Sequence, residues 1–573
     1  MDTTTTTPRK RSFSSESKDG KGLLNEFVNT LNHISRDHGG VEKKKKKNEK
    51  KKRNVYRMRS MNLVSKIITP ILCFVLFCTA CIVHSTILNV LSLLGIVLST
   101  LWLPITAGLE RRVNYTFGFL LFSNWFVFWM LPIVVQGAVF KLGLHSAVLK
   151  PIYDILDQSK TVRSFASKYV YKKEKFADFF ATQVYFIFGA LTSLALMIYY
   201  HQTHDGKLPF YIIMMYNFAW IGPGGRSMGA AYSIAHKEGH FDIYRKNLKQ
   251  IFGNLFENVL GVFYGSVPYN FTTTHISIHH RIDAGRGDTL YNWDISRSSV
   301  PSFLLYLVRG LLHTSGLGGL WQFYFSPRKR DRTVCFQRLL FGIVAYWIVL
   351  PAIVIALFDF QFYFYVVLQP LLCMTFFLSI INHGFHGFIQ QDSEGKMIDC
   401  VASTTMIGSL DDYFGEDDHM AHHHHLSVYY RDLPNHQRKQ RDLWIKNKAS
   451  VFQGLDVFTV SIYILLKAYP LLSRRYMDFS GKMKLEDVEL MLKKRANRRE
   501  TRYSGVLPEI PWGESKNGDG RWNSPEMIDG MEDKALISRL FPGLDTGLLQ
   551  FQRLVCDKMD EGMPPVKPIC AFD

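Results

Sequence analysis

The chain has 573 residues, 47% of them hydrophobic, and a formal net charge of +19. Its mean hydropathy of -0.01 averages polar ends with an apolar middle. Residues 62–382 carry repeated apolar runs that approach the roughly twenty residues required to cross a bilayer. This pattern excludes a purely soluble globular protein, and the scattered cysteines exclude a disulfide framework. We therefore expect an all-α polytopic membrane protein built from transmembrane helical hairpins.

Residues 1–60 are polar and are expected to be disordered. Within them, Lys43 to Lys47, Lys50 to Lys52 and Arg53 form a basic run before the first apolar segment. By the positive-inside rule this run places the N-terminus in the cytoplasm, where it can also contact anionic lipid headgroups. A basic run can instead bind nucleic acid. A cationic flank beside a membrane segment is more often topological, so we expect no nucleic-acid partner.

Residues 61–150 are expected to form the N-terminal membrane segments. Ile67–Val83 and Ile87–Ala107 have the lengths of a membrane-spanning pair. A third run, Phe117–Phe140, contains Pro132 and precedes a basic stretch. Three full crossings would place that basic stretch outside the cytoplasm. The third run is therefore re-entrant or interfacial, or one of the first two runs does not span.

Two hairpins follow. Phe179–Tyr200 leads through a polar loop to the shorter Leu208–Ile221. Phe336–Phe358 and Gln361–Ile381 form a tight hairpin that turns at Asp359. Each hairpin returns the chain to the cytoplasmic side in this topology.

The remaining apolar stretches are ambiguous. Ile251–Gly265 is weakly amphipathic and is expected in the membrane interface. Ser302–Leu312 and Val457–Leu472 fit either interfacial helices or membrane spans. Residues 476–573 are polar and are expected to be a cytoplasmic tail, with a charged helix at Leu485–Arg499 and no metal-ligand pattern.

The clearest chemical signal is an HxxHH motif, here the third motif, formed by His419, His422 and His423. At 3.6 residues per turn these three side chains fall within one arc of a helix. Three imidazoles on one face can share a metal ion. His424 and His425 rotate away from that arc, so we exclude them from the predicted ligands. A histidine-rich tract can also be a solvated polar turn, so matching clusters elsewhere are needed.

Two such clusters occur earlier in the chain. The first motif places His236 and His240 four residues apart, on one helical face. The second motif contains His275, His279 and His280. On a regular helix His280 lies well round the side from the other two. We therefore predict a π-bulge, a device common at functional sites, that turns all three inward.

The second hairpin ends in Asn-His-Gly-Phe-His-Gly, at Asn382 to Gly387. All the clusters reach the same side of the membrane, which favours one shared site over unrelated polar patches. Imidazole suits iron, zinc and copper, so ligand type does not select the metal. Nine imidazoles, counting His386, exceed the needs of one tetrahedral zinc and suit two metals. Glu416, Asp417 and Asp418 precede the third motif and either orient ligand N–H groups or provide helix N-terminal charge.

Three histidine motifs in this order, with these membrane runs between them, resemble the membrane fatty acid desaturase superfamily. The resemblance covers Phe179 to Asp432, within a desaturase-like membrane domain at residues 176–475. It implies two hairpins that hold the histidines in a di-iron cap on the cytosolic face. Acyl-CoA members also carry an Asn-x-x-x-His element before the last motif. The spacing from Asn382 to His386 matches it, which favours His386 over His383 and implies that Asn382 acts on iron through a water.

The resemblance further implies an O2-dependent oxidoreductase that introduces a double bond into the acyl chain of an acyl-lipid or acyl-CoA substrate. Two iron ions would be the cofactor. Their implied ligand set is His236, His240, His275, His279, His280, Asn382, His386, His419, His422 and His423. Electrons would come from a separate donor, cytochrome b5 with its reductase or ferredoxin, because the His-Pro-Gly-Gly of a fused cytochrome b5 domain is absent. The positive net charge would attract an acidic donor. The resemblance and the sequence together indicate that the protein is located in the membrane of the endoplasmic reticulum.

Alternatives remain open at this point. Membrane hydroxylases of alkyl or acyl chains share the same motifs and the same first hydrogen abstraction. A metal-binding receptor or transporter is the non-enzymatic alternative, although transporter sites are expected near the membrane midplane. An acyltransferase is disfavoured because the histidine clusters lack the His-x4-Asp spacing.

Overall fold

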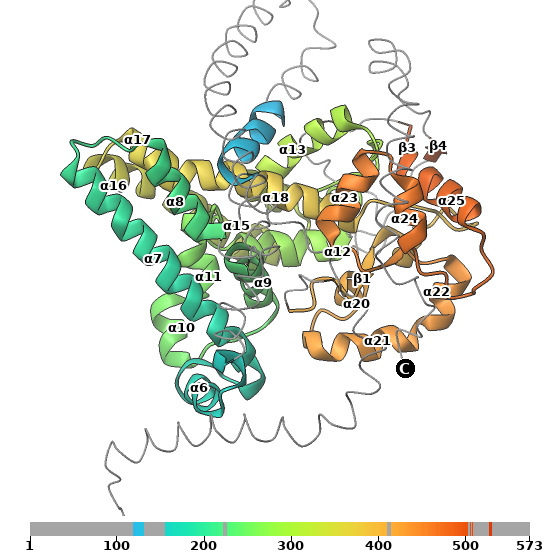
Figure 1. The fold of residues 1–573 in the computed structure, drawn as a ribbon, viewed down its shortest axis with the longest axis horizontal. Helices are drawn as coiled ribbons and strands as arrows, with labels where there is room; N and C mark the ends of the chain where they lie inside the picture. The colour runs from blue at the N-terminus through green and yellow to red at the C-terminus, as the bar shows by residue number, and fades with distance from the viewer. Residues whose placement is uncertain are drawn as a thin grey trace, which may run out of the picture. The chain divides into compact units, whose positions relative to one another are not determined.

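The computed structural model of the protein describes residues 118–130, 155–221, 226–282, 284–409, 414–501, 505, 507 and 527–529. The predictions for residues 1–60, for the two earliest membrane runs and for most of the C-terminal tail lie outside the described residues. The described chain is almost entirely helical (Figure 1), and its strands β1 to β4 are each three residues long. The predicted all-α membrane fold is confirmed.

Helices follow one another along the described chain, and the strands between them are short. The elements before the second hairpin are η1 (Phe126–Met130), α6 (Lys160–Phe165), η3 (Ala166–Val170), η4 (Glu174–Phe179), α7 (Phe180–Thr203), α8 (Phe210–Ile221), α9 (Arg226–His240), α10 (Lys246–Phe252), α11 (Leu255–Asn258), η6 (Leu260–Tyr264), η7 (Phe271–His279), α12 (His280–Ile282), α13 (Val300–Thr314) and α14 (Leu317–Phe325). The second hairpin consists of η8 (Asp331–Cys335), α15 (Phe336–Val344), η9 (Ala345–Val349), α16 (Leu350–Leu357), α17 (Phe360–Tyr363), η10 (Phe364–Leu368) and α18 (Gln369–Phe385). After it come α19 (Asp399–Ala402), β1 (Thr405–Ile407), α20 (His419–His424), η11 (Tyr430–Asp432), α21 (Leu433–Lys439), α22 (Arg441–Asn447), β2 (Val451–Gln453), α23 (Val457–Leu465), α24 (Tyr469–Arg475), α25 (Leu485–Asn497), β3 (Arg498–Glu500) and β4 (Met527–Asp529).

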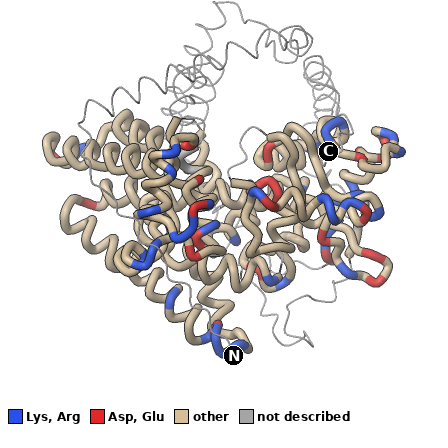
Figure 2. The backbone as a smooth tube through the Cα atoms, turned by 90° about the horizontal axis from the view of Figure 1, so that it is seen from below, with Lys and Arg blue, Asp and Glu red and all other residues tan. Residues whose placement is uncertain are grey.

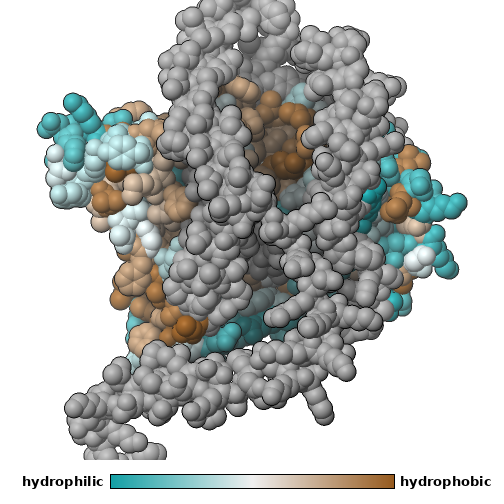
Figure 3. All heavy atoms as spheres, viewed as in Figure 1, coloured by the Kyte–Doolittle hydropathy of each residue, from teal (hydrophilic) through white to brown (hydrophobic). Residues whose placement is uncertain are grey.

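Within the described residues, three helices are long and apolar enough to cross a membrane: Glu174–Thr203, Asp331–Leu357 and Phe360–Phe385. Gly118–Met130 and Phe210–Ile221 are shorter apolar helices. The predicted long helices of both hairpins are therefore confirmed, and the partner of the first hairpin is short, as the sequence indicates. On the left of the molecule, where α7 and α16 lie in Figure 1, the tube of Figure 2 is mostly tan and the surface in Figure 3 carries brown patches below a polar tip.

Asp359 forms the turn of the second hairpin, as predicted. Its Oδ1 accepts a hydrogen bond from the amide of Phe362 at 2.6 Å, which caps α17. Its Oδ2 lies 2.8 Å from Nε2 of His201, near the C-terminal end of α7. These contacts tie the ends of the two hairpins together, at the upper left of Figure 1, where Figure 3 shows a polar surface.

The stretches that the sequence left ambiguous form shorter helices. Val300–Thr314 is a single helix, α13, whereas α23 and α24 divide the second stretch near Lys467, whose φ is 56°. Neither is among the candidate spans of the described chain. Residues 251–265 are broken into the end of α10, α11 and η6, with Phe256 and Tyr264 buried in the core. Their position in the membrane interface stays a prediction.

Helix α13 crosses α18 at very close range. A Cβ at Gly310 would lie 1.9 Å from Oγ of Ser379, so only glycine permits this approach. The contact holds α13 against α18, a few residues before Asn382 and His386.

The predicted charged helix near the C-terminus is confirmed as α25, and it is part of the core. Its Val488, Leu492 and Ala496 are buried in one apolar cluster with Phe385 at the end of α18 and Leu472 on α24. The segment that follows the predicted membrane domain therefore packs against the element that carries His386.

Candidate metal centre

Helix α9 presents the first motif. His236 and His240 lie one turn apart, and their Nε2 atoms are 3.1 Å from each other. Nδ1 of His236 faces the other way and lies 2.8 Å from Oε2 of Glu416. The predicted pairing of the two imidazoles on one helical face is thus present.

The second motif lies on a π-helix, η7, which runs from Phe271 to His279. The amide of His280 donates to the carbonyl oxygen of His275, the five-residue spacing of a π-helix. The predicted π-bulge is confirmed, but the π-helical segment is nine residues long rather than a single inserted residue. This geometry turns His275 and His280 toward the first motif.

The third motif forms α20, where His419 and His422 are buried. His422 Nε2 lies 3.0 Å from His236 Nε2, which joins the first and third motifs directly. His424 instead places Nδ1 3.2 Å from Nε2 of Gln440, and the ring of His425 lies 4.3 Å from that of His436. Both side chains point away from the other motifs, as the helical geometry predicts.

The histidines gather in two groups. One ring nitrogen from each of five side chains lies within 4.8 Å of the others in what we call the five-histidine group, formed by His236, His240, His275, His280 and His422. The same distance criterion joins His279, His386 and His423. His419 Nε2 lies 3.1 Å from His386 Nε2 and completes what we call the four-histidine group. Every histidine in the predicted ligand set therefore belongs to one of two candidate metal positions.

Helix α18 ends with two histidines that have different surroundings. His386 enters the four-histidine group, and its Nδ1 lies 2.9 Å from the carbonyl oxygen of Ala402. His383 is completely buried elsewhere, between Oγ of Ser461 at 2.6 Å and the carbonyl oxygen of Arg297 at 2.8 Å. The structure thus places His386, and not His383, with the other candidate ligands.

Asn382 belongs to neither group. Its Nδ2 donates to the hydroxyl of Tyr306 on α13 at 2.5 Å. Its predicted action on a metal through a water stays a prediction. Nothing in the sequence marks Tyr306 as its partner.

Two carboxylates contact Nδ1 of a candidate ligand histidine and orient its ring. Glu416 contacts His236 and also lies 2.9 Å from Nζ of the buried Lys237. Burial would raise the pKa of Glu416, but the histidine and the lysine outweigh it and lower that pKa to about 2. Asp288 lies 2.7 Å from Nδ1 of His279 and accepts hydrogen bonds from the amides of Ala284 and Leu290.

The sequence pointed to only one of these carboxylates. Glu416 fulfils the predicted orienting role, whereas Asp417 and Asp418 contact Ser409 and Gln437 instead of a ligand histidine. Asp288 was missed because it lies in a loop between motifs, nine residues after the histidine that it contacts. A search for an acidic residue shortly after each motif would have found it.

Burial lowers the pKa of His240, His275, His280, His419 and His422 well below the ordinary histidine value. These imidazoles are therefore neutral and keep a lone pair for a metal ion. Nε2 of His275 and both ring nitrogens of His280 are buried without a hydrogen-bond partner among the described residues. A metal ion would provide the missing partner, so the donor set fits a histidine-bound metal pair.

Comparison with protein families matches residues 209–454 to fatty acid desaturases. The matched segment contains all three histidine motifs and both groups. Residues 209–454 therefore form a fatty acid desaturase-family segment of the chain. No curated protein and no solved structure matches the chain.

The match to fatty acid desaturases gives the site its chemical context. The chain is an integral membrane oxidoreductase that modifies fatty acids, and its substrate is a lipid or acyl chain. The superfamily is known for di-iron centres, and among the described residues the two histidine groups are positions that could bind metal.

Changing Glu416 to glutamine is expected to weaken metal binding in the five-histidine group by about 10- to 100-fold, because His236 loses the charge that fixes its ring. Titration of the apo protein with Fe(II) under anaerobic conditions measures this change. Asp418→Asn is the matched control, since the carboxylate of Asp418 accepts from Nε2 of Gln437 at 2.6 Å. Equal affinities in the two variants would contradict the orienting role of Glu416.

Proposed function

We propose that this protein is an O2-dependent di-iron desaturase that introduces a double bond into a fatty acyl chain. The observation that carries the proposal is the division of nine buried or half-buried imidazoles into groups of five and four inside the desaturase-family segment. Imidazole nitrogens suit iron, and nine of them provide ligands for two ions.

The proposed ligands of the first iron are the five-histidine group, and those of the second are the four-histidine group. Glu416 and Asp288 hold Nδ1 of His236 and His279, which leaves Nε2 of each ring facing its group. Asn382 is proposed to act on the second iron through a water. Its hydrogen bond to Tyr306 would fix the orientation of the amide.

The two irons would supply the activation of O2 for hydrogen abstraction from an unactivated C–H bond. Desaturation takes two hydrogen atoms from adjacent carbons, and O2 leaves as two water molecules after receiving two further electrons and two protons from a donor. Because this chain holds no donor domain among its described residues, a separate protein such as cytochrome b5 with its reductase, or ferredoxin, is proposed to supply the electrons. A cytoplasmic site in the endoplasmic reticulum membrane is part of the same proposal.

Expression in a host without endogenous desaturases, followed by mass spectrometry of total lipids, tests the function. Products two mass units lighter than their precursors are expected for the wild type and absent for His422→Ala. His424→Ala is the matched control on the same helix, because its ring contacts Gln440 outside both groups. It is expected to keep activity.

Products sixteen mass units heavier than their precursors would mean that the protein is a hydroxylase instead of a desaturase. An unchanged lipid profile with a competent donor present, together with no bound iron, would favour the alternative of a metal-binding receptor or transporter.

A further inference from the structure

The loop of residues 284–299 between the second motif and α13 is polar and yet buried. Asp288, Asn292, Asp294 and Arg297 are each at most 2% exposed. Burying so many polar groups is unfavourable unless each has partners. Two arginines of the loop find partners in the C-terminal segment that follows α24: Arg286 donates to Glu500, and Arg297 donates to the carbonyl oxygen of Arg495.

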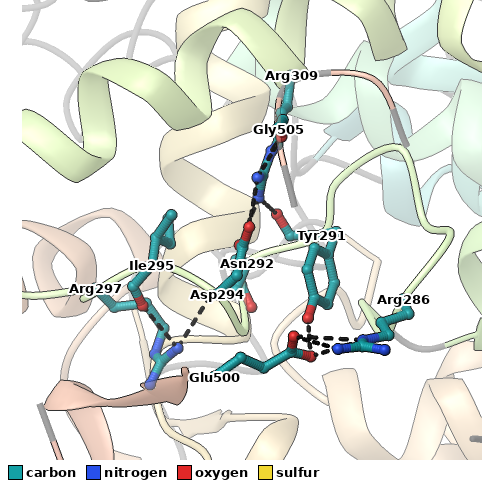
Figure 4. A network of polar contacts seen from close by, with 9 residues as sticks. All are labelled: Arg286, Tyr291, Asn292, Asp294, Ile295, Arg297, Arg309, Glu500 and Gly505. Carbon is teal, nitrogen blue, oxygen red and sulfur yellow. Dashed lines mark hydrogen bonds and ion pairs between the residues drawn. The ribbon is translucent and has the colours of Figure 1, made fainter. Parts of the chain in front are cut away.

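Glu500 on β3 holds the part of this loop around Asp288. Its carboxylate accepts from Arg286, with 2.9 Å to Nη2, and from the hydroxyl of Tyr291 (Figure 4). Its amide donates to the carbonyl oxygen of Trp293 at 2.8 Å. Arg286 and Tyr291 flank Asp288, so one side chain fixes the chain on both sides of the residue that contacts His279.

Arg297 connects the same C-terminal segment to the end of α18. Its guanidinium donates to backbone carbonyls. These include Gly387, Asn292 and Ile295 at 3.0 to 3.3 Å, and Arg495 at 3.0 Å. Asn292 in turn donates to the carbonyl oxygen of His386 at 3.2 Å.

Arg309 closes the network from α13. Its guanidinium forms two 2.7 Å contacts with Asp294, and it donates to the carbonyl oxygens of Tyr291 and Gly505 (Figure 4). The buried loop is therefore fixed on three sides, by α13, by the end of α18 and by the segment that contains Glu500.

We propose that Glu500 is a positioning residue for the four-histidine group. It holds Arg286 and Tyr291, these hold the turn that carries Asp288, and Asp288 orients His279. The C-terminal segment, which carries no metal-ligand pattern, is then part of the architecture of the second metal position. The inference rests on the proposed function for the presence of iron, but it concerns only this chain's own residues.

Among the described residues, no side-chain hydrogen bond joins the five-histidine group to this network. Its orienting carboxylate is Glu416, which is separated from His236 by 180 positions and does not belong to the loop. Removing the Glu500 carboxylate should therefore affect one metal position and spare the other.

The test compares Glu500→Ala with Glu500→Gln in the purified full-length protein. The alanine variant is expected to bind about one iron per chain instead of two, with a 10- to 100-fold weaker second site. The glutamine variant keeps an acceptor oxygen for Tyr291 and Arg286 and is expected to be closer to the wild type. Iron content by elemental analysis and Mössbauer spectroscopy of the bound iron are the readouts.

The Mössbauer spectra of two histidine variants serve as references that identify which iron is lost. The spectrum of Glu500→Ala should match that of His279→Ala and differ from that of His240→Ala. Asp359→Asn is the stability control, because this carboxylate contacts His201 and caps α17 at the other end of the hairpin. It should lower the unfolding temperature with both irons retained.

Two bound irons in Glu500→Ala with the wild-type spectrum would overturn the inference. Loss of both irons in proportion to unfolding would also overturn it, since the role would then be structural alone. A wild-type protein that binds no iron would instead overturn the proposed function.

Discussion

Replacing His386 with alanine is expected to lower turnover by about 1,000-fold or more, which corresponds to about 4 kcal/mol of activation free energy. His386 belongs to the four-histidine group, and its Nε2 lies 3.1 Å from that of His419. Without it the second metal position loses one of its imidazoles. Iron content and the rate of product formation measure the effect.

His383→Gln is the matched control, because His383 lies three residues earlier on the same helix and is fully buried. Its nitrogens contact Ser461 and the carbonyl oxygen of Arg297, and a glutamine amide can make one of these contacts. The control is expected to keep both irons and to lose stability by about 1 to 3 kcal/mol. Loss of iron in the control and retention in His386→Ala would reverse the assignment.

Gly342→Ala is expected to destabilise the folded protein by about 3 kcal/mol and to reduce activity with it. A Cβ at this position on α15 would lie 2.0 Å from the carbonyl oxygen of Pro268. Backbone atoms on both sides leave no flexible side chain to move. Because Pro268 precedes η7, the displacement would reach the second motif. Thermal unfolding in detergent and iron content are the measurements.

Gly189→Ala in α7 is the control for this substitution. A Cβ there would come no closer than 4.0 Å to the carbonyl oxygen of Ala219, so it has ordinary space. Because alanine is about 1 kcal/mol more favourable than glycine within a helix, the control should be neutral or slightly stabilising. Equal losses in the two variants would show that close packing at Gly342 is not the cause.

Much of this molecule follows from local sequence properties. The long apolar helices and the turn at Asp359 follow from segment length, composition and a capping residue. The histidine faces follow from helical periodicity, since His419 and His422 on one side and His424 on the other obey the 3.6-residue repeat. Even the π-helix follows from local spacing, because no regular helix turns both His275 and His280 inward.

The sequence by itself determined which elements are apolar, which histidines share a helical face, and the family to which those motifs belong. Only the tertiary structure decided how the second motif is divided, with His275 and His280 in one group and His279 in the other. It also supplied the role of Glu500, and the separation of 214 positions between Glu500 and Arg286 explains why. Periodicity reports only neighbours along the chain, whereas a contact at that separation exists only after α18, α25 and the buried loop have packed together.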